Sequence, residues 1–328
     1  MKKTELYREL GINLDLALEA HETIRGERGG EIPGVSLEEE SFDTAHVRTV
    51  TVLDQRGASI IGKPPGKYIT IESDVLRINN KALHEQLSKT LSEKLKETLP
   101  FKSEEDSVLI VGLGNWNATP DALGPKVVEK TMATRHLYGR VPQELTNGLR
   151  SVSAIAPGVL GITGIETAEI IKGVVEKTQP SLVIAIDALA AGSVERIGST
   201  IQIADTGINP GSGVGNKRAG LNVETLGVPV IAIGVPTVVH AGIIAHDIIE
   251  SFVEKMKNKP PLTQLTKEMS PPLLRIIIDE VLQPYSNSLM VTPKEIDDLI
   301  ENTSKVIAMA LTESLHPAMP EEVANYLH

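Results

Sequence analysis

The sequence has 328 residues, with 32 Lys and Arg against 43 Asp and Glu, so its formal net charge is −11. This length allows one large domain or two. The acidic balance argues against direct binding of nucleic acid, because contacts to phosphate require a basic surface. The absence of cysteine excludes disulfides, thiol nucleophiles and cysteine-based metal sites. Chemistry must therefore come from carboxylates, hydroxyls, histidines or a cofactor.

The first 32 residues are polar and charged and end in Gly26-Glu-Arg-Gly-Gly30, which indicates a loosely attached arm. No apolar segment of the kind a secretion signal contains follows the two lysines near the start. The longest apolar run, Gly227–Val239, is too short to span a membrane. We therefore expect a cytoplasmic protein with no membrane partner.

The next segment predicts a small β extension followed by a helix. Val47–Leu53 alternates as a strand does, Asp54–Gly57 has the composition of a turn, and Lys67–Ile71 is a second strand. Leucines recur every four residues over Leu83–Leu99, a helical stripe that stops at Pro100. Such a stripe is usually part of a core and less often a contact between subunits.

From Ser107 onward, strands alternate with helices. Strands are predicted at 107–114, 152–156, 181–188, 200–204 and 228–234, and helices at 120–136, 163–177, 238–256, 272–283 and from Thr292 onward. Two of these helices start with capping-box spacing, at Thr163-Gly-Ile-Glu166 and Thr292-Pro-Lys-Glu295. The alternation predicts an α/β fold of three layers, with a mostly parallel twisted sheet between two layers of helices.

Two aspartates lie where strands of this sheet end, which is where α/β folds place their sites. Asp121 follows the first strand of the α/β region, and Asp187 ends an apolar strand in which a carboxylate is costly unless it is paired or used. Two close carboxylates can share a proton, activate water and protonate a leaving amine, or they can hold a divalent metal. The alternative is that Asp121 is only a helix N-terminal acid and Asp187 only caps a turn.

Two further segments suggest substrate binding. The tripeptide Asp205-Thr-Gly207 occurs in pepsin-like proteases, but those are all-β proteins with two such loops. A turn or a substrate-binding loop is therefore the better interpretation of Asp205. The glycine-rich stretch after it fits no nucleotide-binding motif. Its Lys217 and Arg218 instead suit an anionic substrate.

Serine and histidine chemistry has little support in this sequence. It contains no Gly-x-Ser-x-Gly motif on which a serine hydrolase site is built. His240 and His246 are six residues apart, which places them on different faces of a helix and is poor spacing for a shared metal. For His240 a surface or hydrogen-bonded position is the better interpretation. We therefore expect no cofactor, with a divalent metal at Asp121 and Asp187 as the alternative.

Several blocks of sequence keep one order over most of residues 107–300. They are Gly112–Pro125, Pro157–Thr167, Ala185–Ala191 and Asp205–Arg218, extended by Gly227–Val239 and Leu289–Glu295. Together these blocks resemble the germination protease (spore protease) family of spore-forming bacteria. The resemblance implies an endopeptidase that degrades small acid-soluble spore proteins early in germination, in the forespore and spore core. It also implies a homotetramer with a fold like that of hydrogenase maturation proteases.

The same resemblance assigns site residues. The family's proposed catalytic pair falls on Asp121 and Asp187, the two residues that strand position had singled out. The family is made as an inactive zymogen that removes its own N-terminal segment, and the cleavage junction falls at Asp15-Leu16. The implied organisation is a propeptide of residues 1–15 and a single α/β protease domain of 16–328, with an N-terminal extension (16–105) and a catalytic core (106–328).

Overall fold

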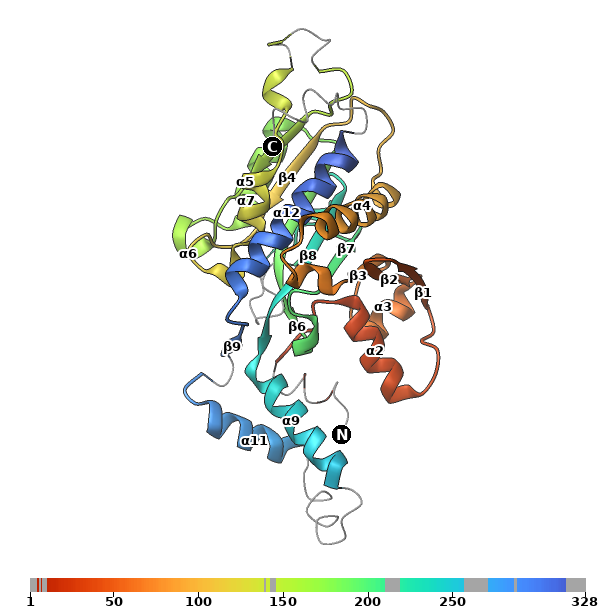
Figure 1. Cartoon of the computed structure of the whole chain (residues 1–328), viewed down its shortest axis with the longest axis vertical. Coiled ribbons are helices and arrows are strands. Elements are labelled where there is room, and N and C mark those ends of the chain that lie inside the picture. Colours follow the sequence, from red (N-terminus) through yellow and green to blue (C-terminus); the bar gives the residue numbers. More distant parts are fainter. Residues whose placement is uncertain are drawn as a thin grey trace.

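A computed structural model describes residues 5, 7, 11–138, 140–141, 146–209, 219–256, 271–285 and 288–316 of the protein. Its centre is a nine-stranded sheet in the order β1-β2-β3-β7-β8-β6-β4-β5, with β9 paired to β8 (Figure 1). The strands are β1 (Val35–Phe42), β2 (Ala45–Val52), β3 (Gly66–Glu72), β4 (Val108–Gly112), β5 (Val152–Ile155), β6 (Leu182–Ala191), β7 (Thr200–Ala204), β8 (Val230–His240) and β9 (Met290–Val291).

The sheet is mixed, so the expectation of a mostly parallel sheet is wrong. Neighbours β8, β6, β4 and β5 run parallel to one another. The pairs β1–β2, β2–β3, β3–β7, β7–β8 and β8–β9 are antiparallel. Only residues 192–199 separate β6 from β7, fewer than the dozen or more residues that a crossover to a parallel strand needs. The chain therefore turns back, and β7 runs against β8.

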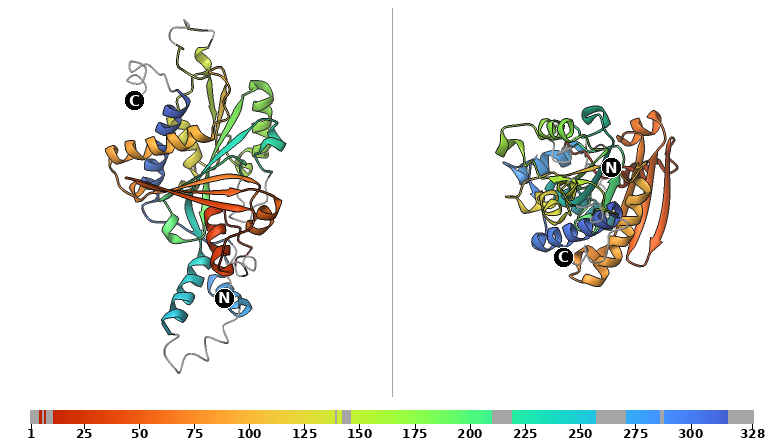
Figure 2. Two further views of the ribbon diagram at one scale, coloured as in Figure 1. Left: turned by 90° about the vertical axis from the view of Figure 1, so that its right-hand side faces the viewer. Right: turned by 90° about the horizontal axis from the view of Figure 1, so that it is seen from above.

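Helices cover both faces of the sheet. They are α2 (Ala17–Arg28), α3 (Gln55–Ile61), α4 (Lys81–Thr98), α5 (Leu123–Lys130), α6 (Leu160–Thr163), α7 (Thr167–Thr178), α8 (Val223–Leu226), α9 (Ala241–Met256), α11 (Pro271–Leu282) and α12 (Ile296–Leu315). Short 3-10 turns lie at η1 (Asp74–Arg77), η2 (Thr119–Asp121), η3 (Arg135–Leu137) and η5 (Val194–Arg196). In Figure 2, α4 and α12 lie together on one face, and the helix α7 (green) lies on the other.

Strand alternation divides the core into two halves. In β4, Val108 and Ile110 belong to the cluster that contains the buried residues of α4, α5 and α12. Leu109 and Val111 belong to a second cluster with residues of α7 and α8. Successive side chains of a strand point to opposite faces, so this division confirms an α/β arrangement with helices on both sides. The leucine stripe of α4 supplies three fully buried residues of the first cluster, as its core interpretation predicted.

From residue 11 onward, the N-terminal segment packs into the molecule, so this described part is not the loosely attached arm that was predicted. Leu16, Ala17 and Leu18 are completely buried, and α2 packs against β2 and β3. The prediction failed because the segment is polar in overall composition, although its helix is amphipathic and buries an apolar face. Strand β1 was not predicted, because Glu38-Glu-Glu40 lies in it on the exposed edge of the sheet.

Several predicted helix boundaries differ from those in the structure. The expected turn at Asp54 is the N-cap of α3, where its carboxylate accepts a hydrogen bond from Gly57 N at 2.8 Å. Thr163 ends α6 instead of starting α7. The helix expected to reach residue 136 ends at Lys130. The helix expected at Thr292 starts at Ile296, and the Thr292 hydroxyl donates to the carbonyl oxygen of Thr237 at 2.8 Å.

Candidate active site

The two predicted catalytic aspartates lie beside neighbouring strands of the sheet, but Asp187 does not end its strand as predicted, because β6 continues past it to Ala191. β4 and β6 pair in parallel up to Gly112 and Ile186, and Leu113 N donates to the Ile186 carbonyl oxygen at 2.8 Å. Asp187 is therefore the next residue of β6. Asp121 ends the turn η2, which lies against β6 and β8. Both aspartates therefore lie near the carboxyl end of β4.

Glycines allow the loop that carries Asp121 to fold back tightly. Gly114 has a φ of +113°, and a Cβ atom there would lie 1.9 Å from the carbonyl oxygen of Asp121. That oxygen accepts a hydrogen bond from Asn115 N at 2.9 Å. A Cβ at Gly112 would lie 2.2 Å from the carbonyl oxygen of Gly124. The Gly112-Leu-Gly114 pair thus serves close backbone packing and fixes where Asp121 lies.

Asp187 is buried at the centre of the sheet, with 5% of its surface exposed. It lies in register with Gly234 of β8, and its Oδ1 accepts a hydrogen bond from Ala188 N at 3.0 Å. Asp187 and Leu189 are two residues apart in a regular part of β6, so their side chains face the same side of the sheet. Burying a carboxylate at this point costs free energy, which favours a functional over an incidental role.

A cavity of about 90 Å³ lies on this side of the sheet. Leu189 and Gly234 line it, and so do Asp15 from the N-terminal segment and Lys63 from the loop after α3. Thr206 and Gly207, from the Asp-Thr-Gly turn after β7, complete one wall. The cavity therefore lies between the predicted cleavage junction at Asp15 and Leu189, two residues beyond Asp187 on β6.

The Asp15–Leu16 junction is held inside the protein by hydrogen bonds on both sides. Asp15 Oδ2 accepts from Ala190 N at 3.0 Å, and the Asp15 carbonyl oxygen accepts from Lys63 Nζ at 2.8 Å. On the other side, Ala17 N donates to Gln202 Oε1 at 2.7 Å. Lys63 and Gln202 were not predicted, because neither belongs to a motif and each contacts this segment only in the folded chain.

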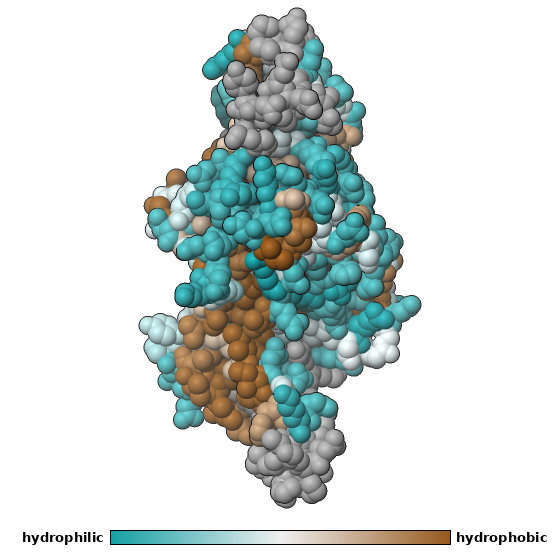
Figure 3. Space-filling model, viewed as in Figure 1, coloured by the Kyte–Doolittle hydropathy of each residue, from teal (hydrophilic) through white to brown (hydrophobic). Residues whose placement is uncertain are grey.

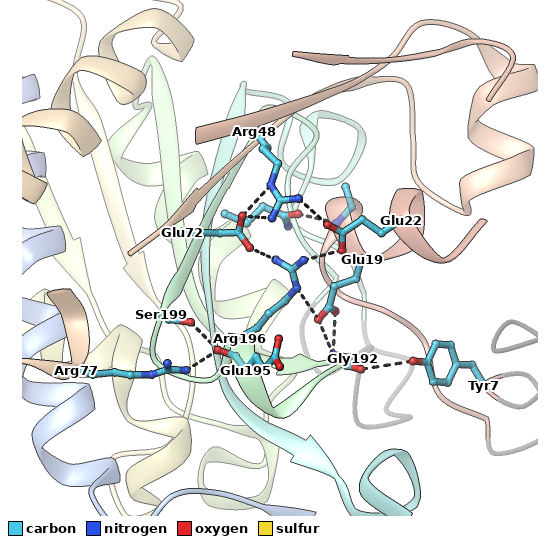
Figure 4. A network of polar contacts seen from close by, with 12 residues as sticks. Tyr7, Glu19, Glu22, Arg48, Glu72, Arg77, Gly192, Glu195, Arg196 and Ser199 are labelled. Carbon is cyan, nitrogen blue, oxygen red and sulfur yellow. Dashed lines mark hydrogen bonds and ion pairs between the residues drawn. The ribbon is translucent and has the colours of Figure 1, made fainter. Parts of the chain in front are cut away.

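A network of ion pairs anchors α2 directly after the junction (Figure 4). Arg196 Nη2 lies 2.6 Å from Glu22 Oε2, and its Nε lies 3.3 Å from Glu19 Oε1. Arg196 and Arg48 both also pair with Glu72 of β3. These contacts link α2 to two strands of the sheet and to η5.

Glu19 is the most deeply buried acid of this network. Gly192 N donates to both of its carboxylate oxygens at 2.9 Å, and 5% of the residue is exposed. Burial raises the pKa of Glu19 to about 7, against the opposing effects of Arg196 and the Gly192 N–H. Gly192 directly follows β6, so Glu19 fastens α2 to the same strand that carries Asp187.

Asp205 has a structural contact in the turn after β7. Its Oδ1 accepts a hydrogen bond from Lys67 N at 2.8 Å, which ties β3 to this turn. A Cβ at Gly66 would lie 2.5 Å from the same oxygen, so the contact depends on a glycine there. The turn interpretation is thus confirmed, and substrate binding by Asp205 stays a prediction. Lys217 and Arg218 lie outside the described residues.

His240 is buried at the end of β8, and its Nδ1 accepts a hydrogen bond from Gly242 N at 3.0 Å, as expected of a hydrogen-bonded histidine. His246, Asp247 and Glu250 form a different cluster on α9, with ligand atoms within 4.8 Å of one another. In the described part of the chain, this is the one group of three such side chains close enough to share a metal ion. His246 and Glu250 are four residues apart, so they lie one helical turn apart on the same face of the helix. The sequence prediction considered only the spacing of His240 and His246 and therefore missed this cluster.

No helix in the described ranges is long and apolar enough to cross a membrane. Comparison with known proteins gives matches over almost the whole chain. The sequence model of the germination protease family matches residues 14–270 and 264–327. The germination protease of Caldanaerobacter subterraneus subsp. tengcongensis is 50% identical over 322 residues, which cover 97% of this chain and 98% of the relative. Those of Clostridium tetani (46% over 327 residues, 97% and 100% covered) and Bacillus subtilis (44% over 362 residues, 98% and 98% covered) are also similar.

These matches define the protein as a peptidase. It belongs to the germination protease family, as the resemblance of its sequence blocks predicted.

Proposed function

We propose that the protein is an endopeptidase that degrades small acid-soluble spore proteins during germination, in the forespore and spore core, with Asp121 and Asp187 as its catalytic pair. The observation that carries this proposal is the contact between Asp15 and Ala190, three residues beyond Asp187 on β6. This contact supports the proposal because it brings an acidic residue that precedes the proposed cleavage bond next to the strand that carries Asp187. The strands β8, β6, β4 and β5, with helices on both faces, support a fold like that of hydrogenase maturation proteases.

The proposed reaction uses the carboxylates as an acid and a base. One carboxylate takes a proton from water, whose oxygen attacks the carbonyl carbon of the substrate. The other carboxyl group gives a proton to the leaving nitrogen, and the C–N bond breaks. The products are a new carboxyl group and a new amine. This scheme needs no cofactor; the rival mechanism holds a divalent metal on the same two carboxylates.

We further propose that residues 1–15 are a propeptide that the enzyme removes from itself at Asp15–Leu16. Asp15 lines the cavity beside β6, so the segment occupies the space that a substrate needs. Its removal empties that space. Asp205, Lys217 and Arg218 are proposed to contact the substrate afterwards, and the turn after Asp205 borders the same cavity.

The proposed assembly is a homotetramer. An apolar surface covers α9 and α11 in the lower part of Figure 3. Its exposed members include Ile248, Phe252, Leu273, Ile276, Ile277 and Val281. A contiguous exposed apolar surface of this kind marks a protein interface, which supports contact between copies of the chain.

The catalytic proposal is tested with purified protein and a small acid-soluble spore protein as substrate. We expect Asp121→Asn and Asp187→Asn each to slow cleavage roughly 1,000-fold, because each removes one proton-transfer group. Asp43→Asn, at an exposed acid in the turn between β1 and β2, is the control and should leave the rate unchanged. Wild-type rates in both active-site variants contradict the proposal.

Two further arms separate the alternatives. Loss of activity in a chelator, with rescue by an added divalent ion, supports the metal-assisted mechanism. Tight binding of the substrate by wild-type protein without cleavage supports a non-enzymatic peptide-binding protein.

A further inference from the structure

We propose that Lys63 is a third catalytic group, which binds the carbonyl oxygen of the cleaved peptide bond and stabilises the negative charge that forms on it. The inference rests on the proposed self-cleavage at Asp15–Leu16. It adds a cation to a site whose motif residues are two carboxylates.

The geometry places the ammonium group on the reacting oxygen. Lys63 Nζ lies 2.8 Å from the carbonyl oxygen of Asp15, which is the carbonyl of the Asp15–Leu16 bond. Donors that stabilise an oxyanion act from about 2.7–3.1 Å. When water adds to the carbonyl carbon, charge therefore develops within hydrogen-bond distance of a cation.

The loop that carries Lys63 is held in place by its neighbours. α3 ends at Ile61, the left-handed conformation of Gly62 then turns the chain, and two prolines follow Lys63. The Tyr68 hydroxyl donates to the Pro64 carbonyl oxygen at 2.8 Å, and the Thr206 hydroxyl donates to the Tyr68 oxygen at 3.1 Å. A catalytic donor must be fixed before the reaction starts, and these contacts fix the loop.

The peptide is fixed on both sides of the bond as well. Ala190 N binds the Asp15 carboxylate, and Gln202 Oε1 accepts from Ala17 N. Leu16, between them, is extended and fully buried. Holding both sides keeps the carbonyl oxygen directed at Lys63, which lowers the entropy that the reaction must lose.

Charge and burial favour a role beyond simple packing. Burial lowers the pKa of Lys63, and the carboxylates of Asp15 and Glu19 oppose that effect. A cation that has lost part of its hydration interacts more strongly with developing charge than an exposed one. Burying the Lys63 ammonium group costs stability, and that cost is harder to explain if Lys63 only fills space.

The step balances without any further reactant. The oxygen of water bonds to the Asp15 carbonyl carbon, and the C=O electron pair moves onto the oxygen that Lys63 binds; Lys63 keeps its proton. Collapse restores the C=O bond and breaks the bond to Leu16 N. One proton of the water passes through the carboxylate pair to that nitrogen. A carboxyl group at Asp15 and an amine at Leu16 result.

The test follows self-cleavage of the full chain by intact mass, as the fraction of molecules that start at Leu16. We expect Lys63→Met to slow cleavage at least 100-fold, as the loss of an oxyanion donor does. Lys63→Arg keeps the charge and should retain part of the rate. Lys81→Met, at a lysine side chain on α4 that is 90% exposed, is the matched control. Melting temperatures show whether each variant is folded.

A pH profile separates catalysis from structure. The wild-type rate should fall on the alkaline side as Lys63 loses its proton, and Lys63→Arg should move that fall to higher pH, because arginine stays charged. Equal rates for wild type and Lys63→Met overturn the role of Lys63 and leave self-cleavage intact. Wild-type protein that never yields a chain starting at Leu16 overturns the self-cleavage proposal and the role of Lys63 with it.

Discussion

Glu19, which attaches α2 to the end of β6, makes the stability of the protein depend on pH. Its pKa in the folded protein is about 7, raised from 4.5 by burial, so between these values the folded state binds more protons than the unfolded state. Stability must then fall as pH rises from about 4.5 to about 7. The shift corresponds to about 3 kcal/mol at most.

Glu19→Gln keeps the shape of the side chain and removes its titration, so we expect the variant to lose this decline. The measurement is the free energy of unfolding in urea at several values between about pH 5 and pH 8. A decline of the same size in Glu19→Gln contradicts the assignment.

His316 changes stability in the opposite direction and must be separated from Glu19. Its Nδ1 accepts from Arg150 N at 3.0 Å, and burial together with Arg150 lowers its pKa to about 4. Its contribution is present above its ordinary pKa of 6.5 and is lost as pH falls towards 4. The difference between Glu19→Gln and wild type cancels this contribution, because both proteins contain His316.

At the scale of elements, Arg196 fastens α2 to the sheet. Its guanidinium contacts acids of α2 and β3 (Figure 4), and its removal leaves the buried Glu19 without its cation. We expect Arg196→Met to cost about 3 kcal/mol, as the loss of one partner of a buried pair does.

Hydrogen exchange tests this locally: amides of α2 should lose roughly 100-fold protection, while those of β4 and β6 keep more of theirs. Lys305→Met breaks an exposed i,i+4 pair with Glu301 on α12 and should change little. Unchanged protection of α2 in Arg196→Met contradicts the role of this network.

Elements buried on both faces were the predictable ones. The apolar runs of β4 and β6 indicated strands. They also pointed to Asp121 and Asp187, although β6 continues past Asp187 to Ala191. β1 was missed because it is an exposed edge strand whose partners are known only from the fold. Lys63 was missed for a similar reason, since it meets Asp15 across 48 residues of sequence. The local hydrophobic pattern of a sequence indicates which segments are buried. The direction of a strand and the contacts between distant side chains depend on how the whole chain folds.

At the scale of the molecule, one sheet unites the N-terminal extension with the α/β strands. β3 pairs with β7, and β7 pairs with β8, so the extension continues the sheet that ends at β5. α2 packs on the extension strands, and the chain entering it passes the end of β6 at Ala190. The extension therefore explains why an N-terminal segment reaches the site of the α/β strands at all.

The apolar surface of α9 and α11 predicts how copies of the chain meet. Ile276 and Val281 are 61% and 74% exposed, and placing lysine at both should prevent burial of this surface. We expect wild-type protein to have about four times the chain mass of 35.3 kDa in light scattering after size exclusion, and Ile276→Lys/Val281→Lys to have a lower mass. Leu53→Lys, at a single exposed leucine after β2 (64% exposed), is the control and should stay tetrameric. A tetramer that survives both lysines shows that the copies meet elsewhere, because a charge buried without a partner costs too much to be tolerated in an interface.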